Sequence, residues 1–236
     1  MTFYQDILSA ISSKKKLLGI VIDPEKMQLE SIPNLCKAIK KSPATHILFG
    51  GSTYNGTDFD KIVSELKRHL ELPIFLFPGD YNQLSNKADV LLFLSLLSGR
   101  NPEYLIGQQT KAVNKLKQTT LEIIPTAYLL IESGVETAVE RVSNTIPIGR
   151  ENIELAIQTA KAGEYLGMKM VYLEAGSGAK HSVPLQMITN VKQNLTIPLI
   201  VGGGLRSKQA IEDAFSAGAD MIIIGTAFEN DLSFFN

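Results

Sequence analysis

The chain has 236 residues and a formal net charge of -1, from 23 Lys and Arg against 24 Asp and Glu. The length fits one α/β domain of the larger kind, and a hydrophobic share of 44% excludes disorder as a description of the whole chain. The balanced charge, with no basic run longer than Lys14-Lys15-Lys16, argues against a nucleic-acid binder that relies on bulk electrostatics.

The single cysteine and the first residues bear on the compartment of the protein. Cys36 lies within an apolar pattern that predicts a small buried side chain, and one cysteine allows no disulfide framework. The sequence does not start with a basic leader followed by an apolar stretch, and no apolar run approaches the ~20 residues of a spanning helix. We expect a soluble cytoplasmic protein without a transmembrane segment, folded as a single domain over residues 1–236.

Eight short apolar runs rich in β-forming residues follow one another along the chain, at residues 18–22, 46–49, 74–77, 90–94, 122–130, 170–173, 199–201 and 221–224. Nearly all are continuous rather than alternating, which is typical of parallel strands covered by helices. Helical periods at residues 59–70, 153–160 and 210–215 predict amphipathic crossover helices. Ser207 and Gly218 stand where a cap and a stop of the last helix belong.

Strand alternating with helix eight times favours a (β/α)8 TIM barrel over an open doubly wound sheet. The third unit departs from the rule, because residues 80–89 are too few and too polar for a full helix. The sequence therefore predicts a modified barrel with an incomplete third β/α unit, whose gap in the outer ring opens a groove.

Glycines follow the last two predicted strands, as Gly202-Gly203-Gly204 and Gly225-Thr226. Barrel enzymes build their sites at the C-terminal ends of the strands and commonly bind phosphate after strands seven and eight. Glycine lets backbone N–H groups approach an anion closely, and a helix N-terminus adds partial positive charge. The alternative is that these glycines only form tight turns; the triple glycine beside Gly-Thr favours phosphate binding.

An acidic residue, Asp23, directly follows the first strand, and Ser52 follows the adjacent second strand. A carboxylate and a hydroxyl oxygen at this rim suit Mg²⁺, which bridges to substrate phosphates. The alternatives carry equal weight: Asp23-Pro24 can simply start a turn, and Ser52 can cap a helix or face a loop.

Glu174 ends the sixth strand and precedes Gly176-Ser177-Gly178. Its carboxylate is placed to accept hydrogen bonds from a polyol that carries the phosphate, and it is the candidate general base. The alternative is an ion pair with Lys169 or Lys180. The three histidines have no partners that would make a triad or a zinc site.

Together these motifs resemble the geranylgeranylglyceryl phosphate synthase family, including its bacterial relatives. The likeness covers almost the whole chain and rests on residues 21–26, 49–52, 172–178, 201–204 and 224–226. It implies a modified (β/α)8 barrel that joins a polyprenyl diphosphate such as geranylgeranyl diphosphate to sn-glycerol 1-phosphate, giving an ether-lipid precursor and diphosphate. The resemblance assigns Mg²⁺ to Asp23 and Ser52, and glycerol 1-phosphate to Tyr172, Leu173, Glu174, Ala175, Gly176, Ser177, Gly178, Gly203, Gly204, Gly225 and Thr226.

One position departs from part of the family. Val21 stands where the branch that includes the heptaprenyl-using bacterial enzymes has a lysine, so the chain resembles the other branch, group II. Whether Lys26 or Arg206 takes over a contact with a substrate phosphate stays open, as does the prenyl length. The resemblance also implies a homo-oligomer, because relatives form dimers or hexamers.

An isoprenoid chain needs a long apolar trough, which we expect to run from the mouth of the barrel toward the incomplete third unit. Its candidate walls are Phe77, Tyr81, Leu96, Leu97, Tyr104 and Tyr128. For each of these, ordinary core packing is an equally good interpretation.

Two other functions fit parts of the pattern. A phosphosugar isomerase or synthase of the phosphate-binding barrel type would share the glycines but would need no metal at strand one. A non-catalytic phospho-ligand or membrane-surface binding protein is the third interpretation, and the absence of a basic amphipathic helix argues against its membrane form. Dependence of the activity on Mg²⁺ would distinguish the prenyltransferase from the phosphosugar enzyme.

Overall fold

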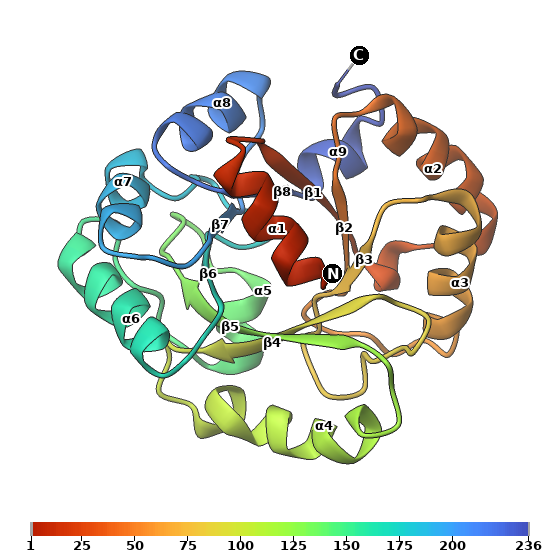
Figure 1. Cartoon of the computed structure of the whole chain (residues 1–236), viewed down its shortest axis with the longest axis horizontal. Coiled ribbons are helices and arrows are strands. Elements are labelled where there is room, and N and C mark those ends of the chain that lie inside the picture. The colour runs from red at the N-terminus through yellow and green to blue at the C-terminus, as the bar shows by residue number, and fades with distance from the viewer. Residues whose placement is uncertain (1, 236) are drawn as a thin grey trace.

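The computed structural model describes residues 2–235 and shows a closed barrel of parallel strands, each bonded to the next in chain order (Figure 1). The strands are β1 (Leu17–Ile22), β2 (His46–Phe49), β3 (Ile74–Leu76), β4 (Val90–Leu96), β5 (Glu122–Leu130), β6 (Met170–Glu174), β7 (Leu199–Gly202) and β8 (Met221–Ile224). β8 pairs with β1 and closes the barrel. The predicted (β/α)8 architecture is confirmed, and every predicted strand is present.

Helices surround the strands on the outside. The ring consists of α2 (Ile32–Lys41), α3 (Phe59–His69), α4 (Gln108–Leu116), α6 (Ile153–Tyr165), α7 (Leu185–Gln193) and α8 (Lys208–Ser216), with the short α5 (Ala138–Ser143) and α9 (Thr226–Asn230) near the rim. α8 is capped as predicted, since the Ser207 side chain accepts a hydrogen bond from the Ala210 amide. Gly218 follows it with a φ of +114°, which glycine adopts without strain.

The third unit is incomplete, as predicted. Between β3 and β4, residues 77–89 form turns and loop instead of a helix, and the outer ring is open between α3 and α4 (Figure 1). α4 is preceded by a π-helical turn, Glu103–Gly107, which no local sequence pattern predicted.

Apolar side chains form two cores, because successive strand residues point to opposite faces of the barrel wall. One core fills the barrel and includes Leu48, Phe75 and Ile223. The other lies between strands and helices and includes Cys36, whose buried thiol has a pKa raised to about 11. Cys36 is therefore the small buried residue that its pattern predicted.

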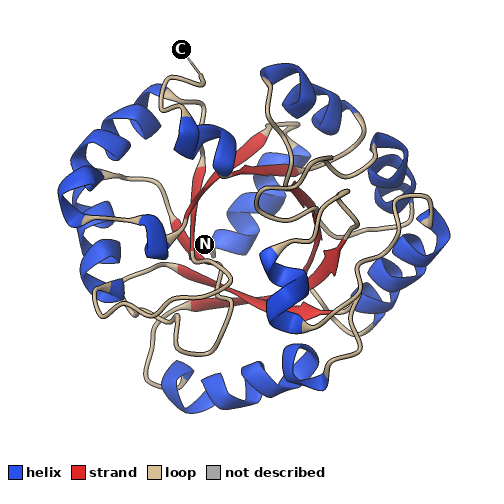
Figure 2. Ribbon diagram, turned by 180° about the vertical axis from the view of Figure 1, so that it is seen from behind, coloured by secondary structure: helices blue, strands red, loops and turns tan. Residues whose placement is uncertain are grey.

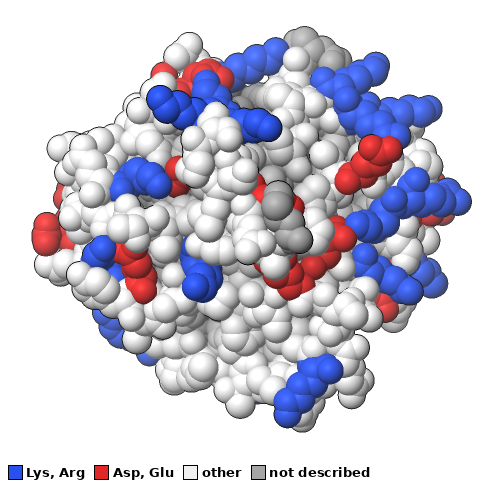
Figure 3. Space-filling view, in the orientation of Figure 1, with Lys and Arg blue, Asp and Glu red and all other residues white. Residues whose placement is uncertain are grey.

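The N-terminal end of the barrel is closed by α1 (Phe3–Ser12), which crosses the opening (Figure 1). The backbone N–H groups of Phe3 and Tyr4 donate to the Glu122 carboxylate at 2.6 and 3.0 Å, and Ile7 is buried in the barrel core. His46 is buried at this same end, and burial lowers its pKa to about 4. Basic and acidic side chains are intermingled on this face (Figure 3).

At the opposite end the strands open into the loops that follow them (Figure 2). The candidate site therefore lies at this C-terminal end, where the barrel is not covered by α1. No helix among residues 2–235 is long and apolar enough to cross a membrane.

Candidate functional site

Loops after six of the strands, β1, β2, β5, β6, β7 and β8, converge on one cavity at the C-terminal rim, and Phe77 after β3 also lines it. Eleven of the residues selected from the sequence line it together: Asp23, Ser52, Tyr172, Glu174, Gly176, Ser177, Gly178, Gly203, Gly204, Gly225 and Thr226. Leu173 and Ala175 do not, because strand alternation turns their side chains outward into the core beneath the helices. The two side chains thus support the wall rather than face the cavity.

The glycines after β7 are required by geometry. Gly203 and Gly204 have φ values of +82° and +69°, and a Cβ on Gly203 would lie 2.4 Å from Glu174 Oε1. The backbone N–H groups of Gly203, Gly204 and Gly225 make no hydrogen bond within residues 2–235. The tight turns are confirmed, and phosphate binding stays a prediction, for which unpaired N–H groups are available as donors to an anion.

Glu174 is almost fully buried, with 7% of its surface exposed. Its Oε1 accepts a hydrogen bond from the Gly176 amide at 2.6 Å, and within residues 2–235 it forms no ion pair with Lys169 or Lys180. Burial raises the pKa of its carboxyl, and the Tyr172 hydroxyl and the Gly176 amide only partly oppose this. A buried carboxylate with a raised pKa in a cavity is suited to take a proton.

The Tyr172 hydroxyl lies beside this carboxylate. Burial is the main reason why its pKa is raised well above that of a free tyrosine, so it stays a protonated donor. Its oxygen is buried and has no hydrogen-bond partner of good geometry among the described residues. Buried hydroxyls without partners are rare, which points to a polar ligand at this place.

Asp23 ends β1 and caps the short helical turn Pro24–Lys26, where its Oδ1 accepts from the Glu25 amide at 3.1 Å. The turn-forming interpretation of Asp23 is therefore correct, but it occupies only one carboxylate oxygen. Lys26 Nζ lies 3.6 Å from Asp23 Oδ2 and 2.8 Å from Glu229 Oε2. Arg206, also on the cavity wall, donates to the Ala179 carbonyl at 2.7 Å.

The surroundings of Asp23 fit a hard cation. A Cβ on Gly51 would lie 2.8 Å from Asp23 Oδ1, so only glycine lets the end of β2 pack this closely on the carboxylate. Ser52 comes next and lines the same cavity. Residues 2–235 contain no group of three or more His, Cys, Asp or Glu that would hold a metal alone. A cation bound here would take its remaining oxygens from substrate or water, as Mg²⁺ commonly does.

A second, apolar cavity of about 110 Å³ lies over the incomplete third unit, next to the polar one. Besides residues from 77–84, its walls come from β4, β5, the π-helical turn, α4 and α5 and include Leu91, Leu92, Leu94, Leu96, Tyr104, Ala112, Tyr128, Val139 and Val142. Phe77, Tyr81, Leu96, Tyr104 and Tyr128 line it as expected. Leu97 does not, and its selection was wrong: Leu96 packs inside the barrel, whereas Leu97 packs outward near Gly163 of α6.

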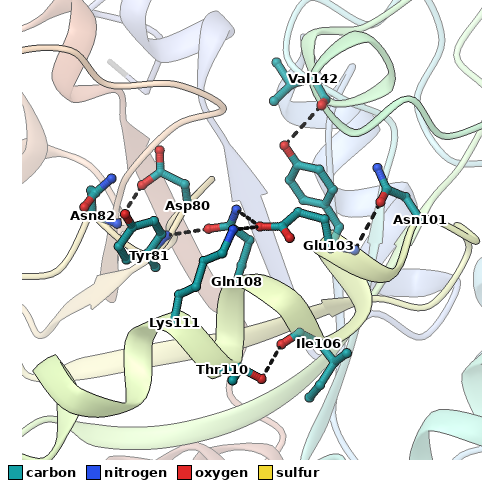
Figure 4. Close-up of polar contacts among 11 residues, drawn as sticks. Asp80, Tyr81, Asn82, Asn101, Glu103, Ile106, Gln108, Thr110, Lys111 and Val142 are labelled. Carbon is teal, nitrogen blue, oxygen red and sulfur yellow. Dashed lines mark hydrogen bonds and ion pairs between the residues drawn. The ribbon is translucent and has the colours of Figure 1, made fainter.

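Polar contacts fix the outer wall of this apolar cavity (Figure 4). Gln108 accepts from the Tyr81 amide at 2.9 Å and donates to Glu103 at 2.6 Å, which joins α4 to the third-unit loop. The Tyr104 hydroxyl donates to the Val142 carbonyl of α5 at 3.1 Å. These contacts join segments far apart in sequence, and no local pattern could have revealed them.

The two cavities meet along a shared border of Gly51, Ser52, Phe77, Tyr128 and Val139, which line both. Phe77 stacks on Tyr172 with ring centroids 5.4 Å apart and meets Tyr128 edge-on at 5.8 Å. An anionic group at the polar cavity and an apolar chain in the other would thus be joined across a short aromatic border.

The chain resembles proteins of known name over its whole length. The model of the PcrB family matches residues 11–234. A geranylgeranylglyceryl phosphate synthase of Flavobacterium johnsoniae is 54% identical over 235 residues, covering 100% of this chain and 97% of that protein, and one of Pyrococcus furiosus is 42% identical over 218 residues, covering 92% and 86%. The crystal structure of (S)-3-O-geranylgeranylglyceryl phosphate synthase from Thermoplasma acidophilum, in complex with its substrate sn-glycerol-1-phosphate, superimposes with a TM-score of 0.93 at 35% identity, covering 100% of this chain and 94% of that one.

Proposed function

This chain belongs to the PcrB family, and from that premise we propose that it is a prenyltransferase that joins a polyprenyl diphosphate to sn-glycerol 1-phosphate. The product would be geranylgeranylglyceryl phosphate or a close analogue, with diphosphate released. The observation that carries the proposal is the direct contact between a polar cavity with unpaired amides and an apolar cavity, along Ser52 and Phe77. A phosphosugar enzyme would have no use for the apolar one.

The head group of glycerol 1-phosphate takes the end of the polar cavity formed by β6, β7 and β8. The amides of Gly203, Gly204 and Gly225 bind its phosphate, since these residues line the cavity and their N–H groups have no partners within residues 2–235. The Tyr172 hydroxyl and the Glu174 carboxylate receive the glycerol hydroxyls. The unpaired amides supply the partial positive charge that attracts the phosphate, so phosphate binding here does not depend on a basic side chain.

Glu174 acts as the general base. A glycerol oxygen attacks C1 of the prenyl chain, the C1–oxygen bond to diphosphate breaks with its electron pair leaving on diphosphate, and the hydroxyl proton passes to Glu174. Burial raises the pKa of this carboxyl, which improves it as a proton acceptor. Phe77, Tyr128 and Tyr172 border the reacting carbon, exclude water and offer ring faces to positive charge that develops there.

Asp23 and Ser52 would hold Mg²⁺, through the Asp23 oxygen that does not cap the turn and the Ser52 hydroxyl. The cation supplies neutralisation of the charge that builds on the departing diphosphate. Lys26 lies 3.6 Å from the same carboxylate and is in reach of an anion bound there. The prenyl chain extends into the apolar cavity along Phe77 and Tyr128.

The deciding experiment incubates the purified chain with labelled geranylgeranyl diphosphate and each enantiomer of glycerol phosphate. We expect a prenylated glycerol phosphate from the sn-1 enantiomer only. EDTA should abolish product formation and added Mg²⁺ should restore it. No product with any prenyl length from C15 to C35 would contradict the proposed reaction, and activity that survives EDTA would contradict the metal.

We also propose that the chain acts in the cytoplasm as a homo-oligomer. Large apolar side chains stand exposed at the end of α6, where Tyr165 is 80% and Leu166 is 73% exposed, and such residues are commonly covered by a partner. Light scattering on the purified protein should give a mass above 25.8 kDa. A monomer across the concentration range would contradict this.

A further inference from the structure

A glutamine in the incomplete third unit forms two hydrogen bonds with the backbone at the end of β2. Gln83 lies in the loop at residues 77–89 and is 1% exposed. Its side-chain carbonyl accepts from the Gly51 N–H at 3.2 Å, and its amide nitrogen donates to the Gly51 carbonyl at 3.0 Å. One side chain thus pairs both backbone groups of the residue before Ser52, as a neighbouring strand would.

Gly51 is held between two segments that leave it no room. On one side, a Cβ on Gly51 would lie 2.8 Å from Asp23 Oδ1. On the other, a Cβ on Gly79 would lie 2.4 Å from the carbonyl oxygens of both Gly51 and Ser52. The third-unit loop, the end of β2 and Asp23 are therefore packed together, and a shift of Gly51 would move the adjacent Ser52 relative to Asp23 in the cavity that both line.

The same loop also borders the apolar cavity. Tyr81 and Leu84, on either side of Gln83 in sequence, line that cavity, while Gln83 itself turns away from it toward Gly51. The missing helix is thus replaced by a loop with two contacts: one with the space for the prenyl chain and one with the strand end that carries Ser52.

We propose that Gln83 is a positioning residue, whose amide fixes Gly51 so that the Ser52 hydroxyl and the Asp23 carboxylate converge on the diphosphate and its cation. The inference rests on the proposed function for the identity of that ligand. Groups that orient metal ligands matter because the ligands must be held before the cation arrives. Without the Gln83 amide, two partly buried backbone groups of Gly51 lose their partners and the strand end is free to relax.

The competing explanation is that Gln83 only stabilises the fold. The two explanations differ in which ligand should bind more weakly when Gln83 is replaced. The amides that take glycerol 1-phosphate lie after β7 and β8, where Gln83 makes no contact. If Gln83 is a positioning residue, its replacement therefore lowers the affinity for the cation and the diphosphate and leaves the affinity for glycerol 1-phosphate unchanged.

The test compares Gln83→Met, which keeps the length and removes both hydrogen bonds, with Ser85→Ala. Ser85 is a matched control, because it is a buried polar residue of the same loop, 2% exposed, that accepts from the Lys87 amide and does not touch Gly51. Mn²⁺ binding in the presence of inorganic diphosphate, followed by electron paramagnetic resonance, reports on the rim without turnover. Exchange of the Gly51 amide, followed by NMR on ¹⁵N-labelled protein, reports on the hydrogen bond itself.

For Gln83→Met we expect Mn²⁺ affinity to fall on the order of 10- to 100-fold and kcat to fall with it, while KM for glycerol 1-phosphate stays within about twofold. The Gly51 amide should exchange slowly in the wild type and fast in the variant. Ser85→Ala should leave Mn²⁺ affinity within about twofold of the wild type. Gln83→Asn, one methylene shorter, should show the same pattern and serves if the methionine variant does not fold.

The proposal is overturned if both glutamine variants bind Mn²⁺ as the wild type does, if Ser85→Ala loses as much, or if KM for glycerol 1-phosphate rises in step. Fast exchange of the Gly51 amide in the wild type would also overturn it, with no variant needed. A wild type that binds Mn²⁺ with diphosphate but makes no prenylated product defeats the proposed reaction only, since the metal and exchange measurements still decide the role of Gln83.

Discussion

The two halves of the site are built from different materials. The end formed by β6, β7 and β8 presents backbone N–H groups on glycines with positive φ, such as Gly203, and the Tyr172 and Glu174 side chains there are buried. The apolar cavity over the third unit is walled by side chains from β4, α4, α5 and a loop. A backbone site cannot adapt without moving a strand, whereas a side-chain wall changes with each substitution. We therefore expect strict selectivity for the glycerol phosphate head group. Selectivity for the length of the prenyl tail should depend on the volume that the side chains of the apolar cavity leave free.

Glu174 is where the rigid half should be most sensitive. We expect Glu174→Gln to lower kcat by about 10²- to 10⁴-fold, because the amide cannot take the hydroxyl proton, with a smaller change in KM. In the wild type, kcat should fall as pH drops through the pKa of Glu174, which burial raises above the ordinary value for a glutamate. Steady-state kinetics over pH 4 to 9, run at saturating substrates, check both points. A variant with unchanged turnover would remove Glu174 from the base role.

The same substitution should raise stability. A carboxyl whose folded-state pKa is raised favours folding while it is protonated, and this contribution is lost as pH rises through the raised value. At neutral pH the buried charge of Glu174 therefore opposes folding, and a neutral glutamine removes that cost. Thermal unfolding at pH 7 should show a higher midpoint for Glu174→Gln, and the difference should shrink at acid pH.

Gly203 tests whether the amides bind the phosphate. Gly203→Ala introduces strain at a φ of +82° and a Cβ that would sit 2.4 Å from Glu174 Oε1. A cost of about 1–3 kcal/mol to binding corresponds to a roughly 5- to 150-fold rise in KM for glycerol 1-phosphate. Gly178→Ala is the comparison, since a Cβ there meets nothing within 4 Å although its φ is also positive. Equal effects of the two variants would mean that backbone strain, and not the approach to Glu174, decides binding.

Tyr172 should show a smaller effect. Its hydroxyl lies beside the Glu174 carboxylate but has no hydrogen-bond partner of good geometry among the described residues, so Tyr172→Phe breaks no well-formed hydrogen bond of the protein. Loss of one hydrogen bond to the glycerol should raise KM for glycerol 1-phosphate by up to about tenfold. Without ligand, the variant should be at least as stable as the wild type, because a buried hydroxyl without a partner costs free energy. Calorimetric titration and thermal unfolding measure the two effects; a destabilised variant would mean that the hydroxyl is paired within the protein.

The contrast between the two halves also explains what the sequence could reveal. The strands, the incomplete third unit and the rim residues Asp23, Glu174 and Gly203 follow from local runs and from the rule that loops at strand ends meet at one rim. The tail cavity follows only in part. Leu96 and Leu97 look alike in sequence, but a single step along β4 sends one inward and the other toward α6. Gln83 carried no local signal at all, because its partner lies 32 residues away.

The smallest effect is expected from substitutions in the side-chain wall of the apolar cavity. They should change the preferred prenyl chain length rather than abolish activity. Ala112 on α4 lines the apolar cavity, so Ala112→Leu places three more carbons there and should shift the preferred prenyl diphosphate toward a shorter chain, by a few-fold in kcat/KM. Leu97→Ala is the matched control, since it removes apolar volume at a residue that packs outward, on the α6 side. It should lower the unfolding midpoint through the cavity it creates and leave the order of preference among C15, C20 and C35 substrates unchanged. Because only Ala112 of these two residues lines the apolar cavity, a shift of preference in the control but not in Ala112→Leu would mean that the tail does not occupy this cavity.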